Sequence, residues 1–142
     1  MKFYHLQYGQ QSKALTLAKN KRLNLSNMLY DISVLHMYSN GDKEFEADMI
    51  QTFLDQAPDV LSEIEHHFNH NNATEVGKIA HKFKSSVALF GMDEIFNTLQ
   101  LIENSCRDNN DSAIIADQYA ELKILVKQVI PKIEEEKKLC LK

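Results

Sequence analysis

The sequence predicts an all-α fold: an antiparallel up-down-up-down four-helix bundle with a short preceding helix and an N-terminal extension. Only 4 Gly and 2 Pro occur among 142 residues, which is too few turn formers for a fold of many short strands. In four long stretches, apolar residues recur every three or four positions, the period of an amphipathic helix. Short polar turns separate these stretches, and short turns place consecutive helices antiparallel.

The chain begins with a basic extension, residues 1–27, which is weakly patterned and precedes a bundle over residues 28–142. Residues 1–30 hold five Lys or Arg and no acid, whereas the whole chain holds 16 bases and 20 acids. The main domain is therefore acidic, and we expect it not to bind nucleic acid. The extension could contact an acidic partner or pack on the acidic body of its own chain.

The first two helices follow the extension. Residues 30–38 predict a short helix that Ser39-Asn40-Gly41 ends, and Asp42 can cap the next helix. Pro58 interrupts that second helix and should kink or loosen it. The apolar stripe of the second helix consists of Phe45, Met49, Phe53, Ala57, Val60, Ile64 and Phe68.

The third helix opens at Asn72, which resembles the start of a capping box with Glu75, and Gly91 breaks it. Its expected core face consists of Val76, Ala80, Phe83, Val87 and Phe90. The fourth stripe consists of Met92, Ile95, Phe96, Leu99, Ile102 and Cys106. A polar turn over residues 108–111 follows.

The last helix has a seam with the alternating spacing of a coiled coil. Pro131 should bend its end, and we expect residues 134–138, Glu-Glu-Glu-Lys-Lys, to form a solvated tail. The seam consists of Ile115, Tyr119, Leu122, Val126, Val129 and Ile133.

His81 is predicted to lie on the outward side of the third helix. A helix advances about 100° per residue, which places His81 about 130° from the centre of the core face. Its neighbours on that side are Gly77, Lys84, Ser85 and Ala88, three and four residues away or one turn further. Three of the four are small and leave a clearing around the imidazole.

This arrangement suits a histidine that accepts a phosphoryl group. A neutral imidazole nitrogen is a competent nucleophile near neutral pH. A transferred phosphoryl group carries negative charge on its equatorial oxygens, which a nearby ammonium such as that of Lys84 stabilises. Lys78 and Lys82 flank the clearing. The alternative interpretation is a surface histidine in a basic patch.

Residues 81–86, His-Lys-Phe-Lys-Ser-Ser, resemble the H-x-[LF]-K-[GS]-[SA] signature of histidine-containing phosphotransfer (HPt) domains. The resemblance extends over about residues 29–136. Its further matches are Asp42-x-x-Phe45, Phe53-Leu54-x-x-Ala57-Pro58, Leu61, Leu89-Phe90-Gly91-Met92, Leu99 and Glu103.

The resemblance implies an intermediate in a multistep phosphorelay. By it, His81 takes a phosphoryl group from the aspartate of one receiver domain and passes it to another receiver's aspartate. Lys84 matches the lysine that stabilises the group, and Ser85 the small position, usually glycine, that permits docking. The implied protein is a monomeric phosphohistidine carrier without ATP binding or autokinase activity, and magnesium would belong to the receiver. A scaffold that binds partners without transfer is the alternative.

Several other classes of protein and site are not expected. No apolar run approaches the ~18 residues of a membrane span, so the protein is expected to be cytoplasmic and free of membranes. Cys106 and Cys140 form no CxxC motif and are expected to be reduced thiols. Glu63-x-x-His66 has the spacing of carboxylate-bridged metal sites, but a single copy is too few for one. No cofactor and no metal are therefore expected.

Overall fold

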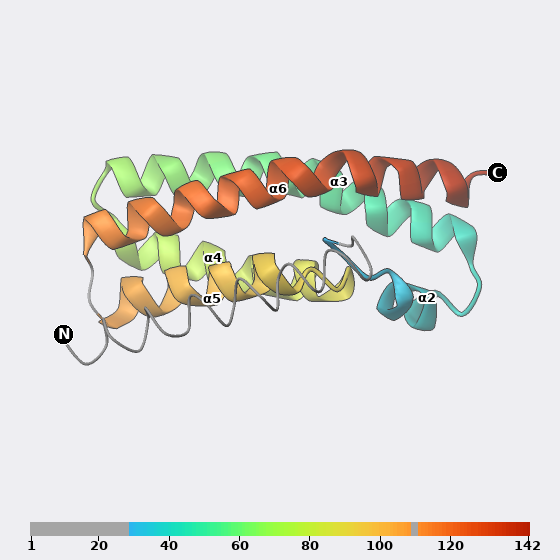
Figure 1. Cartoon of the computed structure of the whole chain (residues 1–142), viewed down its shortest axis with the longest axis horizontal. Helices are drawn as coiled ribbons and strands as arrows, with labels where there is room; N and C mark the ends of the chain where they lie inside the picture. Colours follow the sequence, from blue (N-terminus) through green and yellow to red (C-terminus); the bar gives the residue numbers. More distant parts are fainter. Residues whose placement is uncertain (1–28, 109–110) are drawn as a thin grey trace, which may run out of the picture.

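The computed structural model describes residues 29–108 and 111–142, and these residues form five α-helices and no strand (Figure 1). The all-helical prediction is confirmed for this part of the chain, while the predicted extension, residues 1–27, lies outside it. No described helix is both long and apolar enough to cross a membrane. The helices are α2 (Ser33–Ser39), α3 (Lys43–Asn69), α4 (Ala73–Leu89), α5 (Asp93–Asp108) and α6 (Ser112–Cys140).

The four long helices pack around one apolar core (Figure 1). α3 contacts α4 and α6, α5 contacts the same two helices, and the short α2 packs on α3. Near the middle of the core, the ring of Phe53 stacks on Phe83 at 5.9 Å between centroids and lies 5.1 Å from that of Phe90. Each fully buried Phe contributes roughly 1.5–3 kcal/mol to stability, so this cluster fixes α4 against α3.

The predicted caps of α3 and α4 are present, and α6 is capped in the same way. The side chain of Asp42 accepts from Phe45 N at 3.0 Å, and that of Asn72 accepts from Glu75 N at 3.4 Å. Asp111 accepts from the amides of the second and third residues of α6. These side chains satisfy amide groups that have no partner within their own helix.

Gly91 ends α4 in the left-handed region, with φ of +59°. A Cβ at this position would lie 2.5 Å from the backbone oxygen of Asp31, so only glycine fits here. Asp31 N in turn donates to Phe90 O at 2.9 Å. The turn after α4 therefore holds the start of the described chain against the end of α4, the helix that contains His81.

The predicted core faces are largely confirmed. All five expected positions of α4 are buried, and the stripes of α5 and α6 differ only at Phe96, Cys106 and Tyr119, which are half-buried. On α3 the buried stripe starts one position later than the sequence predicts. Phe45 is 39% exposed, and the buried residues there are instead Glu46, Ala47 and Ile50.

The expected solvated tail over residues 134–138 is wrong, because α6 continues through Pro131 to Cys140. Tyr30 OH donates to Glu136 Oε1 at 2.6 Å, and Lys137 Nζ donates to Gln51 Oε1. These contacts reach 106 and 86 residues back along the sequence and hold the end of α6 on the bundle. α3 likewise runs on through Pro58, so neither proline ends its helix.

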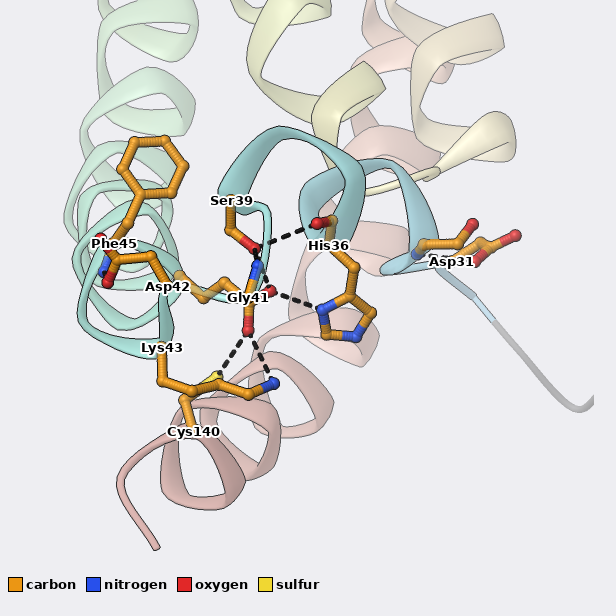
Figure 2. Close-up of polar contacts among 10 residues, drawn as sticks. Asp31, His36, Ser39, Gly41, Asp42, Lys43, Phe45 and Cys140 are labelled. Atoms are coloured by element: carbon orange, nitrogen blue, oxygen red, sulfur yellow. Dashed lines mark hydrogen bonds and ion pairs between the residues drawn. The ribbon is translucent and has the colours of Figure 1, made fainter.

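A buried carboxylate joins α2, α3 and α6 at one end of the bundle (Figure 2). Glu46 is fully buried, and its Oε2 accepts from Ser39 Oγ at 2.6 Å and from His36 Nδ1. Its Oε1 accepts from Lys43 Nζ at 3.1 Å and from Cys140 Sγ at 3.7 Å. Each oxygen of Glu46 therefore accepts from two donors. A buried charge is tolerated when it is paired and hydrogen-bonded in this way.

Candidate functional site

His81 lies on the outward side of α4, as predicted, with 70% of its side chain exposed. Its Nδ1 is 2.8 Å from Oε1 of Glu103 on α5. The two residues are 22 positions apart in the sequence. The packing of α4 on α5 thus supplies the imidazole with a carboxylate partner.

Glu103 is shared between His81 and Lys84. Its second oxygen, Oε2, is 2.7 Å from Lys84 Nζ. The charged contact with Lys84, helped by the hydrogen bond from His81 and opposed by burial, holds the pKa of Glu103 below its usual range. Glu103 is therefore an ionised acceptor at neutral pH.

The ionised carboxylate determines which ring nitrogen of His81 is free. A carboxylate can only accept a hydrogen bond, so Nδ1 must carry the hydrogen. In the neutral ring, Nε2 then carries the lone pair, and it is not the nitrogen engaged by Glu103. The exposed side chain thus presents a nucleophilic nitrogen in a fixed tautomer.

Lys84 lies against α5 rather than extending into solvent, and only 14% of its side chain is exposed. Besides Glu103, its Nζ donates to Gln100 Oε1 at 2.7 Å. It also lies 5.6 Å from the centroid of the Phe96 ring, within range of a cation–π contact. One ammonium is thereby held a single helical turn from the imidazole.

A shallow hollow of about 500 Å³ lies beside His81. It runs between α4 and α5, and its walls include Gly77, Lys78 and Arg107. A Cβ on Gly77 would lie 3.2 Å from Cβ of Cys106, so this glycine lets α5 approach α4 closely. Gly77 therefore serves helix packing as well as the clearing that the sequence predicted.

The remaining predicted site residues separate into two groups. Ser85 and Ala88 are exposed on the side of α4 where the clearing was expected. Lys78 lines the hollow beside His81 and pairs with Glu75 at 3.2 Å. Lys82 instead lines a different groove, between α3 and α4, so the structure does not bring it together with His81.

Glu103 is the site residue to which the sequence reading gave no role in the chemistry. A signal was available, because Gln100, Glu103, Asn104 and Arg107 are spaced to share one face of the predicted helix. Gln100 Nε2 donates to Asn104 Oδ1 at 2.9 Å, and Arg107 Nη2 donates to the same oxygen at 3.1 Å. This polar row lies on the side of α5 that contacts α4, where Gln100 accepts a hydrogen bond from Lys84.

His66, the histidine of the Glu63-x-x-His66 spacing, lies near the end of α3 beside two further histidines. The ring of His66 packs against those of His67 and His70, at 5.2 and 4.3 Å between centroids. Within residues 29–108 and 111–142, no group of three or more His, Cys, Asp or Glu side chains is placed to hold a metal ion. These rings contact one another at a helix end.

Comparison with protein families decides the wider context of this site. A family model described as the Hpt domain matches residues 48–131, more than half of the chain. The chain belongs to the Hpt domain family. The match spans α4 and α5 entirely, so it includes both His81 and Glu103. Comparisons with curated proteins and with solved structures gave no match.

Membership of the Hpt family indicates phosphotransfer in a phosphorelay, and Hpt domains generally interact with receiver domains. The described site is chemically consistent with that role, because it combines an exposed imidazole, a carboxylate that fixes its tautomer and a neighbouring ammonium.

Glu103→Gln is expected to slow phosphoryl transfer by about 10- to 100-fold, by analogy with the loss that follows removal of a carboxylate that orients a metal-bound histidine. The amide can donate to Nδ1 and so favour the tautomer with hydrogen on Nε2. Ring-nitrogen NMR of His81 should show this change, and a stopped reaction with a phosphorylated receiver should show the slower rate. The matched control, Glu121→Gln on the exposed side of α6, should alter neither. Unchanged tautomer and rate in Glu103→Gln would remove Glu103 from the mechanism.

Proposed function

We propose that His81 carries the phosphoryl group, taking it from the aspartyl phosphate of one receiver domain and passing it to the aspartate of another. The observation that carries this proposal is the hydrogen bond between His81 Nδ1 and Glu103, which leaves Nε2 of an exposed ring with its lone pair. In the first step Nε2 forms the N–P bond as the P–O bond to the aspartate breaks and the carboxylate leaves. In the second step the N–P bond breaks as a P–O bond forms on the second receiver.

Lys84 is proposed to offset the negative charge of the transferred group. Its ammonium shares Glu103 with His81 and is largely withdrawn from water, where an electrostatic contact is stronger than in bulk solvent. Lys78, in the hollow beside His81, adds positive potential. Lys82 contributes at longer range, because it lines the opposite side of α4.

Receiver docking is proposed to use the open side of α4. Gly77, Ser85 and Ala88 carry little or no side chain and would let the receiver's aspartate approach His81. An apolar rim is expected from the first helices of the bundle. Met37 and Tyr38 on α2 are 80% and 72% exposed, which makes them the residues for such a rim.

The four long helices are proposed to alternate up and down within residues 28–142, and the chain to act as a monomer in the cytoplasm. It would need no ATP site, no autokinase activity and no cofactor of its own. The magnesium ion used in transfer would be bound by the receiver.

The test is incubation with a receiver domain phosphorylated on its aspartate. We expect the chain to acquire a phosphate that is labile to acid and stable to base, as a phosphohistidine is, and peptide mass spectrometry to place it on His81. A second, unphosphorylated receiver should then remove it. A label mapped to another residue would refute the assignment of His81, and no label from several receivers would favour the scaffold.

A further inference from the structure

A second groove lies between α3 and α4, on the other side of the histidine helix from His81. It has a volume of about 420 Å³. Its α3 wall carries Asp55, Asp59 and Glu63, which are one turn apart and all exposed. Half-buried Ile79 gives its floor accessible apolar surface, with the buried Val60 and Phe83 beneath it, so an acidic rim stands beside an apolar floor.

Two of the three carboxylates on this rim have no partner in the described part of the chain. Asp55 accepts from Gln51 Nε2 at 2.7 Å. Asp59 and Glu63 form no hydrogen bond or ion pair within residues 29–108 and 111–142. Lys82 lines the same groove without pairing with either of them, so among the residues that the structure describes, three carboxylates face one ammonium there. The groove is left with negative charge that a cationic segment would neutralise.

We propose that this groove is an intramolecular docking site for the basic N-terminal segment, residues 13–25. The segment carries four cations and no acid. Apolar residues are interleaved with them, so its chemistry matches both the acidic rim and the apolar floor of the groove. The cations are Lys13, Lys19, Lys21 and Arg22, and the leucines are Leu15, Leu17, Leu23 and Leu25.

The connection between the segment and the groove is short enough for this docking. Asp31 is bonded to Phe90 O, so the described chain starts at the end of α4. Phe83 lies seven residues earlier on α4, about 10 Å along the helix axis. The six residues from Leu25 to Asp31 span up to about 20 Å when extended. A tethered segment has an effective concentration on the order of millimolar, so modest ion pairs suffice to hold it.

The inference does not rest on phosphotransfer, and its test needs none. A carbodiimide joins a carboxylate to a lysine amine by an amide bond, and the carboxylate oxygen leaves in the urea by-product. Because no spacer is added, the reagent captures only groups that are in direct contact, as in an ion pair. In the full chain at high dilution, we expect cross-links from Lys13, Lys19 or Lys21 to the rim carboxylates. Raising the salt from about 0.05 M to about 1 M should weaken them, because the Debye length falls to about 3 Å.

Two triple variants of the full chain provide the comparison. Asp55→Asn/Asp59→Asn/Glu63→Gln removes the rim charges and should abolish the cross-links to α3. Asp117→Asn/Glu121→Gln/Glu134→Gln removes three exposed carboxylates of α6 and should leave the α3 cross-links unchanged. All six positions are exposed, and circular dichroism should show that both variants keep their helices.

An NMR measurement gives a readout that does not depend on the reagent. Neutralising the segment with Lys19→Gln/Lys21→Gln/Arg22→Gln should shift backbone amide signals along the groove, including those of Asp59 and Ile79. Absence of both the cross-links and these shifts would overturn the proposal. Cross-links that form only between differently labelled chains, or equally to α6, would also overturn it.

Discussion

Replacing His81 with glutamine is expected to abolish labelling by a phosphorylated receiver while the helices remain folded. The amide nitrogen of glutamine has no available lone pair, so no N–P bond can form. Loss of a nucleophile that acts together with its neighbours lowers a rate by on the order of 10⁴-fold or more. The fold should tolerate the change, since 70% of the His81 side chain is exposed and surface substitutions usually change stability by about 0.5 kcal/mol or less.

His70→Gln is the matched control for this experiment. His70 is another exposed histidine of the same bundle, but it lies at the end of α3 and outside the hollow beside His81. The His70→Gln variant should acquire the same amount of phosphate as the wild type. Equal labelling of His81→Gln and wild type would show that another residue accepts the phosphoryl group, whereas a His81→Gln chain that has lost its helical spectrum would have to be replaced by His81→Asn.

The direction of His81 could be predicted from the sequence because it depends only on the geometry of one helix. Val76, Ala80, Phe83 and Val87 define the buried side of α4, and all four are fully buried. The 100° advance per residue then determines the outward side without knowledge of any other helix. The same reasoning placed Ser85 and Ala88 correctly.

Contacts between helices could not be predicted in this way. Whether Lys84 lies free in solvent or against Glu103 depends on how far α5 is shifted along α4, and periodicity contains no information on that shift. Lys82 illustrates the same limit, since its neighbour is decided by where α3 runs. Family resemblance pointed to Glu103 as part of a helix but not to its bond with His81.

The end of α6 was mispredicted for a related reason. Residues 134–138 are all charged, and a charged run without apolar spacing looks like a solvated tail. Tyr30 and Gln51 lie far away in the sequence and supply the partners that hold Glu136 and Lys137 on the bundle. On α3, Glu46 lies four residues before Ile50 and seven before Phe53, which places all three on one face of the helix. This spacing was the sign in the sequence that Glu46 is buried.

Glu46→Gln is expected to lower the free energy of unfolding by about 1–3 kcal/mol at neutral pH, the cost of leaving buried hydrogen-bonding groups unsatisfied. Both oxygens of Glu46 accept hydrogen bonds, and the donors come from α2, α3 and α6. Glutamine keeps the shape but replaces one acceptor by an NH₂ group, which would face a donor. Urea unfolding monitored by circular dichroism measures the loss, and Glu44→Gln, an exposed neighbour on α3, is the control.

The pH dependence of this difference separates the charge of Glu46 from its shape. Burial alone would raise the pKa of Glu46, but hydrogen bonds from Ser39, His36 and Lys43 outweigh it and lower the pKa from 4.5 to about 2. A carboxylate whose pKa is depressed by folding contributes stability above its unfolded pKa and loses it as the pH falls through the folded pKa. The wild type should therefore exceed Glu46→Gln most above about pH 5, and the two should converge as the pH approaches about 2. A constant difference across this range would mean that Glu46 stabilises the end of the bundle by packing alone, because a neutral isostere cannot titrate.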